Sequence, residues 1–488
     1  MLGTGIGLLL LTTYGLRVFP FMGAHTAVPL GYDPGLYKAI FEAYANQLPN
    51  IHPGQLDFWM TQHEMGLFLF TNLLHVLSYT SSFLLTFFFA FLATLVGIYL
   101  WLLIGERYPE KKWLTAFLTL GFFLLSICQY QVFWWGYYKN MLGLIFMLVS
   151  LFLLHRKSWL SLLPLGFLLL VHRPTALYTA GLITVYLLWH LFLAIQKGMK
   201  EKKVSKAVLD FIKDHLEIRV GLLALLLFLP FYFSNFNSSI LTLAARIGRS
   251  FTMNAAAGTF FSIPEYLFLS HWYWPLALYG LYESLRKKHF GYLEAGFVFG
   301  MLWVFLKLYF YSRMIIQLDI FLIAMAVIGI IELTPWIRRF RQIAAICLTV
   351  LFILIGWQTV QYVKTNGRPL IKWQEFEFIQ SLPDKMEENA IIISTHKHYS
   401  AWLMGYSGRD VIAPGLFDLD RWGKAQWEDF WKGTATLRAE MLKDYADLKR
   451  PLYIFVGITQ PHYFFDDSNC FKYINRGSFD FIKYICNE

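Results

Sequence analysis

Charged residues are scarce in this sequence. Asp, Glu, Lys and Arg make up 15% of its 488 residues, and hydrophobic residues make up 57%. A soluble globular protein carries about 25% charged residues, so this composition excludes a soluble enzyme and a disordered chain. The net charge of +10 belongs to loops between apolar segments, as described below, and no nucleic-acid partner is expected.

Cysteine is also rare, with four residues in the chain. Cys128 and Cys347 fall within apolar runs, so both are expected to be packed, inert thiols. Cys470 and Cys486 lie near the C-terminus and can pair only if that part of the protein faces an oxidising compartment. Their spacing alone does not decide whether they form a disulfide.

The sequence has instead long apolar blocks, close to the 20 or so residues that cross a bilayer. About eleven spans are predicted, at 2–18, 82–104, 113–133, 135–154, 159–171, 174–195, 219–234, 265–285, 291–311, 313–333 and 342–363. The first block lacks the basic start and cleavage site of a signal peptide and is expected to be an uncleaved anchor. The predicted fold is a polytopic α-helical membrane protein.

Basic residues are concentrated in the membrane part. Residues 1–365 hold 27 Lys and Arg against 15 Asp and Glu, whereas residues 366–488 hold 15 against 17. The basic residues gather in alternate loops, at 107–112, 156–157, 197–206, 286–288 and 338–341. The positive-inside rule makes that side cytoplasmic.

Three segments are therefore expected to face outward: the first loop at 20–81, the middle loop at 235–264 and the C-terminal residues 366–488. We predict a transmembrane domain over 1–365, whose first loop carries the active site, and a small extracytoplasmic α/β domain over 366–488. In that domain, apolar strands such as AIIIS (390–394) alternate with helical stretches, and a hairpin turn is predicted around Asn475 to Ser478.

Asp33 is the acidic residue on which a catalytic interpretation depends. It precedes Pro34 in GYDPGLYKAIFEAY (31–44), which is typical of a helix start, here for an interfacial helix over about 34–47. A simple capping role would also explain an Asp at this position.

Several cations are predicted near the outer ends of spans or in outer loops. They are Lys139, Arg173, Lys307, Arg313, Arg246 and Arg249. A cation costs about 2.5–3.5 kcal/mol at the centre of a span and less at its end, unless it is paired or solvated. A lipid-linked phosphate would pair with several of them at once, with Asp319 and Glu294 as further candidate partners. Snorkelling to the interface explains each one alone equally well.

A carboxylate together with cations suits one reaction. A phosphate leaving group departs as an anion that positive charge stabilises, and an acceptor hydroxyl needs one base. Glycosyl transfer from a phosphate-linked sugar has these requirements, and direct displacement would invert the sugar.

Several segments resemble the C-type (GT-C) glycosyltransferase superfamily. They are YDPGLY after the first span, HEMGLFLFTNLLHVLS (63–78), WGYYKNMLGLIFMLVSLFLL (135–154), LLVHRPTALYTAGL (169–182) and SRMIIQLDIFLIAM (312–325), followed by an outer C-terminal domain. The chain is similar in this respect to protein O-mannosyltransferases and aminoarabinose transferases. The resemblance implies a polyprenyl-phosphate or polyprenyl-diphosphate sugar donor, Asp33 as the catalytic base, and Arg313 near the lipid phosphate.

The sequence also departs from that family. The second outer loop, about 130–138, lacks the acidic residue that several metal-using members place there, so a bound Mg²⁺ or Mn²⁺ is doubtful and no metal ligand is predicted. The chain has Gln62-His63-Glu64-Met65 where many members have a proline-containing stretch, and it lacks the WWDYG motif of oligosaccharyltransferases. His63, Glu64, Asp57 and Tyr37 are candidate accessory residues, although a polar loop explains the first three as well.

Two other functions stay open. A transporter or lipid flippase would place ionisable residues at mid-membrane and often shows two related halves, but few charges are central here and no internal repeat is visible. A catalytically silent relative, whose tail binds a partner, is the other. We expect an integral protein of a prokaryotic plasma membrane that uses a lipid-linked sugar and a glycan, protein or lipid acceptor.

Overall fold

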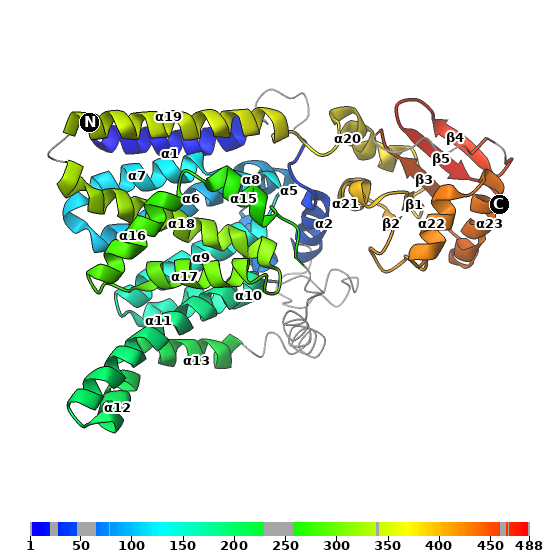
Figure 1. Ribbon diagram of the computed structural model, residues 1–488. Coiled ribbons are helices and arrows are strands. Elements are labelled where there is room, and N and C mark those ends of the chain that lie inside the picture. Colours follow the sequence, from blue (N-terminus) through cyan, green and yellow to red (C-terminus); the bar gives the residue numbers. More distant parts are fainter. Residues whose placement is uncertain are drawn as a thin grey trace. The chain divides into compact units, whose positions relative to one another are not determined.

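The computed structural model describes residues 2–19, 28–45, 65–77, 79–228, 257–337, 341–458, 465–466 and 468–486. Its contacts divide the chain into two compact units (Figure 1). The helical unit comprises Met1–Phe19 and Phe88–Gly367, and the α/β unit comprises Pro20–Phe87 and Arg368–Glu488. Most of the first loop of the sequence analysis is thus grouped with the C-terminal residues by its contacts.

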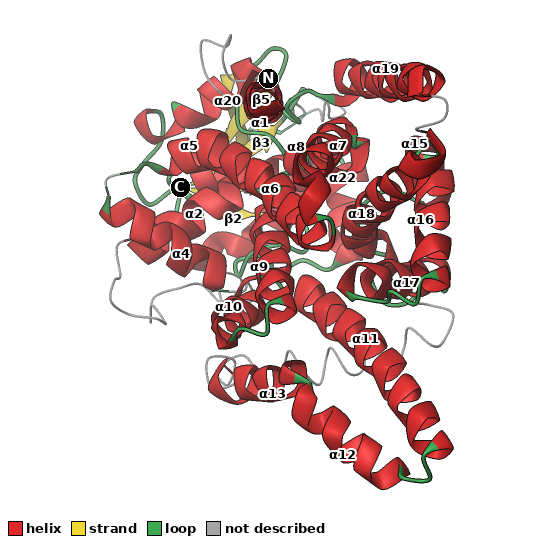
Figure 2. Cartoon of the chain, turned by 90° about the vertical axis from the view of Figure 1, so that its left-hand side faces the viewer, coloured by secondary structure: helices red, strands yellow, loops and turns green. Residues whose placement is uncertain are grey.

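The helical unit contains a series of helices, mostly apolar. They are α1 (Leu2–Val18), α6 (Phe89–Arg107), α7 (Lys112–Leu125), α8 (Ile127–Trp134), α9 (Tyr138–His155), α10 (Leu162–Val171), α11 (Arg173–Lys200), α12 (Val204–Asp214), α13 (Leu216–Phe228), α15 (Ile263–Ser270), α16 (Trp274–Arg286), α17 (Tyr292–Phe305), α18 (Tyr311–Ile337) and α19 (Arg341–Asn366). Figure 2 shows that α11 extends beyond its neighbours and that α12 folds back beside it.

Five of these helices are long and apolar enough to cross a membrane. They are Ser81–Arg107, Tyr138–His155, Arg173–Lys200, Tyr311–Thr334 and Ala345–Asn366, and the bent pair Pro109–Leu125 and Ile127–Trp134 makes a sixth if it counts as one span. The described part of the chain thus has five or six candidate spans. Other predicted spans coincide with helices of 10 to 17 residues, namely α1, α10, α13, α16 and α17.

Ser126 explains why the predicted span 113–133 is broken. Its backbone is extended (φ −70°, ψ 114°), and its hydroxyl accepts a hydrogen bond from the Gln129 N–H as the N-cap of α8. The chain therefore bends by 57° between α7 and α8, as expected where a local side-chain hydrogen bond competes with helix continuation.

Helix α18 forms the centre of the helical unit, because the whole of its apolar window is buried. It lies against α16 at backbone distance: a Cβ added to Gly280 would come within 2.2 Å of the Met325 carbonyl oxygen, and one added to Gly329 within 2.1 Å of that of Leu276. Small residues allow apolar helices to pack this closely.

Among the described residues, two buried carboxylates of this unit do not pair with the predicted outer cations. Asp319 on α18 accepts hydrogen bonds from Ser126 Oγ (2.7 Å) and Gln129 Nε2 (2.9 Å). Glu294 on α17 forms an ion pair with Arg107, at the end of α6. For the described cations the expected pairing was wrong, since Asp319 has neutral donors and Glu294 pairs with a cation from the set of basic residues predicted to be cytoplasmic. Cys347 is exposed on α19 rather than packed, whereas Cys128 is buried as predicted.

The α/β unit combines helices with one mixed sheet. Its elements are α2 (Pro34–Ala45), α4 (Gly66–Val76), α5 (Ser81–Phe83), α20 (Trp373–Gln380), β1 (Ile391–Ser394), α21 (Lys397–Tyr406), β2 (Asp410–Ile412), α22 (Lys424–Lys432), α23 (Ala435–Leu442), β3 (Leu452–Val456), β4 (Phe471–Asn475) and β5 (Asp480–Tyr484). The strand order is β2-β1-β3-β5-β4.

The sheet contains the strands and the hairpin that the sequence predicted. β1 is parallel to β2 and β3, whereas β5 is antiparallel to β3 and to β4. β1 and β3 are buried along their whole length because both faces of the sheet are covered. A disulfide between Cys470 and Cys486 joins the two ends of the β4–β5 hairpin.

Candidate functional site

The backbone around Asp33 begins a helix, as the sequence predicted. The Asp33 carbonyl accepts a hydrogen bond from the Tyr37 N–H at 2.9 Å, and Pro34 is the first residue of α2. Gly31 has φ +90°, a left-handed conformation that favours glycine. This turn redirects the chain just before Asp33, whose side chain is partly exposed.

Helix α2 is anchored on α21 of the C-terminal part. The Tyr32 hydroxyl donates a hydrogen bond to the Lys397 carbonyl at 2.5 Å and lies 3.5 Å from Ser400 Oγ. Burial raises the pKa of the Tyr32 phenol, so it stays a donor at neutral pH. At the other end of the contact, Lys38 Nζ lies 5.2 Å from the centre of the Tyr406 ring.

The second face of α2 packs on α4 through aromatic rings. Tyr37 is 5% exposed, and its ring centre lies 6.1 Å from that of Phe41 and 6.2 Å from that of Phe68. Asn72 Nδ2 donates to the Tyr44 carbonyl at 3.0 Å. Tyr37, a candidate accessory residue, thus lies in a packed interface beside the turn that carries Asp33.

Five predicted site residues lie outside the described residues: Asp57, His63, Glu64, Arg246 and Arg249. Their roles stay predictions.

Of the four remaining predicted cations, three lie at the N-terminal ends of packed helices in the helical unit, whereas Lys307 follows the C-terminal end of α17. Lys139 is the second residue of α9, Arg173 the first of α11 and Arg313 the third of α18. Within about one turn of these cations, a hydrogen bond between side chains joins α18 to α11. Gln317 Nε2 on α18 donates to Thr175 Oγ1 on α11 at 2.8 Å.

Helix α9 packs against two residues at the start of α11, His172 and Thr175. Thr175 Oγ1 lies 2.7 Å from His172 Nδ1, which also accepts from the Thr175 N–H. On α9, Gly143 is so close that an added Cβ would lie 3.1 Å from the His172 Cβ. Glycine permits this approach, and it brings the three helix N-termini to one place.

The Arg313 guanidinium contacts a threonine hydroxyl and an aromatic ring. Its Nη2 donates to Thr259 Oγ1 at 3.0 Å, and its guanidinium carbon lies 5.4 Å from the centre of the Tyr137 ring. Tyr137 in turn donates to the Thr259 carbonyl. The buried Arg313 Nε has no hydrogen-bond partner among the described residues, so the guanidinium retains donor capacity.

The electrostatics of this cluster favour an anion. Helix N-termini carry about half a positive charge each, and cations there destabilise a helix by about 0.3–1 kcal/mol. α9, α11 and α18 have no acidic residue in their first turns, and each has a cation there instead. Converging N–H groups and cations are the arrangement that binds phosphate.

The sequence analysis found the cations but missed the neutral residues that position them. His172, Thr175, Thr259 and Gln317 join the helix ends through side-chain hydrogen bonds. The available signal was the recurrence of polar residues within one turn of each cation, for example Gln317 four residues after Arg313.

No metal site is evident in the described ranges, which contain no group of three His, Cys, Asp or Glu side chains able to hold an ion. His396 caps α21 by accepting from the His398 N–H at 3.1 Å. His398 Nε2 lies 2.8 Å from the Leu370 carbonyl oxygen. Both imidazoles therefore have structural roles.

Comparisons with solved structures identify similar folds. The chain resembles the oligosaccharyltransferase of Archaeoglobus fulgidus in its apo form, with a TM-score of 0.60 and 12% identity, over 94% of this chain and 70% of that one. It resembles AglB from the same organism, in complex with an inhibitory peptide and a dolichol-phosphate, with a TM-score of 0.59 and 12% identity, over 94% and 69%.

A third similar structure is the same archaeal oligosaccharyltransferase tethered to an acceptor peptide with an NVT sequon, with a TM-score of 0.59 and 13% identity, over 94% and 69% of the two chains. No family model and no curated protein matches the sequence. At these identities the likeness concerns the fold alone. The protein is an integral membrane protein with several apolar helices.

Proposed function

We propose that the protein is a membrane glycosyltransferase that moves a sugar from a polyprenyl-phosphate or polyprenyl-diphosphate donor to an acceptor at the outer face of the membrane. The observation that carries this proposal is the convergence of three helix N-termini with Lys139, Arg173 and Arg313 in their first turns. Such a cluster suits a phosphate at the membrane interface, where the head of a polyprenyl lipid lies.

The likeness to AglB supports the same class of donor, because a solved structure of that protein contains a dolichol-phosphate. The proposed role of the cations is to stabilise the lipid phosphate as it leaves with negative charge. Arg246 and Arg249 complete the proposed phosphate-binding set. Because positive charge stabilises the leaving group, the reaction needs no general acid on that side.

Asp33 is the proposed catalytic base. Its carboxylate would accept the proton of the acceptor hydroxyl while that oxygen attacks the anomeric carbon. The bond from that carbon to the phosphate oxygen breaks in the same step, which inverts the sugar. The partly exposed Asp33 and its rigid anchoring through Tyr32 on α21 suit this role.

The proposed topology has eleven spans, with the basic loops in the cytoplasm and the α/β unit outside, in a prokaryotic plasma membrane. The short helices α1, α10, α13, α16 and α17 would supply the additional spans, and α15 with α16 would form one interrupted span. The acceptor is a glycan, a protein or a lipid, which the α/β unit would help to select.

Lipid mass spectrometry on purified protein tests the donor. We expect a polyprenyl-phosphate sugar to copurify with the wild type and with Asp33→Asn, and to be lost in Arg313→Ala. In a transfer assay with that lipid, Asp33→Asn should lose at least about 100-fold in rate, the usual contribution of a general base.

The matched control is Arg219→Ala, which removes an arginine at the start of α13, where Arg219 contacts the Lys213 carbonyl. It should retain both lipid and activity. Normal transfer by Asp33→Asn would refute the role of Asp33. Equal retention of the donor lipid by Arg313→Ala and the wild type would refute the phosphate site.

A further inference from the structure

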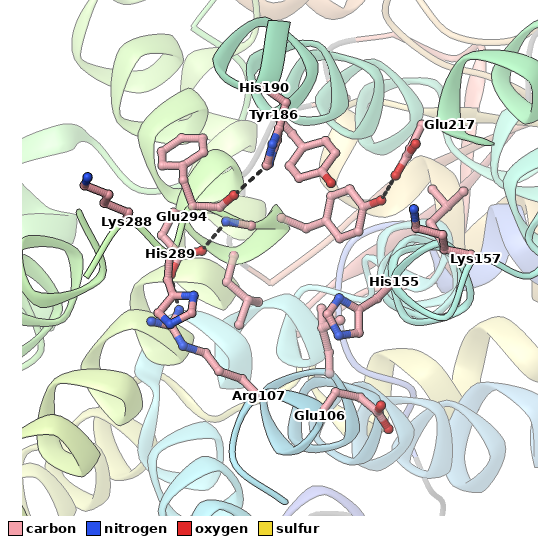
Figure 3. Close-up of a pocket in the computed structure, with 16 residues that line it drawn as sticks. Glu106, Arg107, His155, Lys157, Tyr186, His190, Glu217, Lys288, His289 and Glu294 are labelled. Atoms are coloured by element: carbon pink, nitrogen blue, oxygen red, sulfur yellow. Dashed lines mark hydrogen bonds and ion pairs between the residues drawn. The ribbon is translucent and has the colours of Figure 1, made fainter. Parts of the chain in front are cut away.

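A cavity of about 440 Å³ lies within the helical unit. None of its lining residues belongs to the cation cluster, which consists of Lys139, Arg173 and Arg313. Figure 3 shows its lining, which comes from the ends of α6 and α9, the middle of α11, the starts of α13 and α17, and the segment between α16 and α17. The proposed glycosyl transfer does not use this cavity.

Helix α9 relates the cavity to the cation cluster. It begins at Tyr138, beside the cluster, and ends at His155, in the cavity wall. At about 1.5 Å per residue its 18 residues span roughly 27 Å, close to the thickness of a bilayer core. The cavity therefore lies near the opposite membrane surface, among the basic loops that the positive-inside rule places in the cytoplasm.

The acidic residues of the wall are already engaged. Glu294 pairs with Arg107 and accepts from the Gly291 N–H at 2.8 Å. Glu217 accepts a hydrogen bond from the Tyr292 hydroxyl, and Figure 3 shows this contact. Both buried carboxylates therefore already have partners inside the protein. They are not free to attract a cationic ligand into the cavity.

The third acid, Glu106, pairs with Arg156 at 2.6 Å. The basic side of the wall is different. Lys157 and Lys288 also line the cavity, and among the described residues neither side chain has an ion pair or a hydrogen bond. These two ammonium groups are therefore available to an anion.

The two lysines occupy a backbone conformation that normally selects glycine. Lys157 has φ 52° and Lys288 has φ 58°, and each directly follows the last turn of a helix. The Ser158 N–H bonds to the Leu153 carbonyl at 2.9 Å, and the His289 N–H to the Ser284 carbonyl at 2.8 Å. This is the Schellman ending, in which glycine at the left-handed position is common. A lysine there is strained relative to glycine, and Lys202, which does not line the cavity, has the same conformation.

We propose that this cavity binds a phosphate-bearing anion. Its walls include the apolar side chains of Leu103 and Leu154 beside the charged groups. A cavity with basic and apolar walls, between membrane helices on the cytoplasmic side, fits the headgroup of an anionic phospholipid. A free phosphate compound from the cytoplasm offers the same chemistry.

Replacing the two lysines by glycine tests anion binding without the loss of stability that could itself abolish binding. Lys157→Gly and Lys288→Gly remove the cations and also relieve the left-handed strain, so neither should destabilise the protein. Lys202→Gly is the matched control, because Lys202 has φ 55° and follows the last turn of α11 in the same way but does not line the cavity.

Two probes distinguish the sources of the phosphate. The first is retention of phosphatidylglycerol over phosphatidylcholine after detergent exchange, measured by mass spectrometry of the purified full-length protein. The second is a titration with inorganic phosphate, followed by the shift in Tm. We expect the wild type and Lys202→Gly to prefer phosphatidylglycerol, and the Lys157→Gly/Lys288→Gly double variant to lose about tenfold or more of that preference.

Saturable binding of inorganic phosphate without a lipid preference, lost in the double variant, would also support the proposal and identify a free phosphate compound as the ligand. The proposal fails if the double variant binds either probe as the wild type does, or if the wild type binds neither. Failure here leaves the proposed glycosyl transfer untouched, since none of these residues belongs to that site.

Discussion

Gly35 and Gly405 meet at backbone distance although 370 residues separate them. A Cβ on Gly405 would come within 2.2 Å of the Gly35 carbonyl oxygen, and a Cβ on Gly35 within 1.8 Å of the Ala401 carbonyl oxygen. Helix α2, which starts one residue after Asp33, can therefore lie against α21 only because both positions lack a side chain. This contact makes the placement of Asp33 depend on the C-terminal part of the chain.

A methyl group at this crossing should displace α2. We expect Gly405→Ala to destabilise the α/β unit by about 1–3 kcal/mol, the usual effect of overpacking, and to reduce transfer more than donor binding. Thermal unfolding with copurified-lipid mass spectrometry measures both. Gly477→Ala is the control, since nothing lies within 4 Å of an added Cβ there. Equal unfolding temperatures for the two variants would contradict the close crossing.

Tyr32→Phe tests the anchoring hydrogen bond. Removing the hydroxyl that donates to the Lys397 carbonyl should cost about 0.5–1.5 kcal/mol. If the bond positions Asp33, kcat should fall while the affinity for the donor lipid stays unchanged. Tyr484→Phe is a comparable control, because it removes a hydroxyl bonded to the Ala439 carbonyl in the same unit but away from α2. A kcat loss of the same size in both variants would indicate a general effect on stability.

The N-cap of α21 should be sensitive to acid. Burial lowers the pKa of His396, as do the neighbouring charges of His398 and Lys397, and its unprotonated Nδ1 accepts the capping hydrogen bond. The unfolded state then binds a proton first as pH falls, so the stabilisation is complete above about pH 6.5 and is lost as pH falls through the lower folded pKa.

Replacing this imidazole separates the cap from the titration. His396→Asn keeps a capping side chain that does not titrate, so stability at pH 7.5 should be retained while its fall between about pH 6.5 and 5 becomes shallower. His396→Ala should cost about 1 kcal/mol at pH 7.5. Unfolding temperatures across this range measure the effect, and an unchanged slope in His396→Asn would refute it.

The disulfide between Cys470 and Cys486 makes the stability of the α/β unit depend on whether the unit faces an oxidising compartment. It closes a loop of 16 residues, for which the chain-entropy model gives about 3 kcal/mol. Cys486→Ser should lower the unfolding temperature of the α/β unit accordingly, whereas Cys347→Ser should not. In cells, protein trapped with a thiol reagent should show this pair oxidised if the unit is extracytoplasmic. Full thiol labelling of both residues would place it in the cytoplasm.

Local patterns predicted the helices and the strands well. Apolar blocks gave the helices of the helical unit, and Asp33-Pro34 gave the start of α2, because hydropathy and capping depend on residues close together in the chain. The strand at 390–394 and the hairpin around Asn475 followed from apolar runs and turn residues. The bend at Ser126 was missed because the apolar run continues through it.

The sequence by itself determined that this is a helical membrane protein with a mixed α/β unit, and it identified cations at helix starts. Only the tertiary structure decided which polar groups meet: Gln317 with Thr175, Asp319 with Ser126, and Tyr32 with Lys397. These pairs are 142, 193 and 365 residues apart. Contacts of that separation leave no local pattern, because they form only when the packing of whole helices brings the partners together.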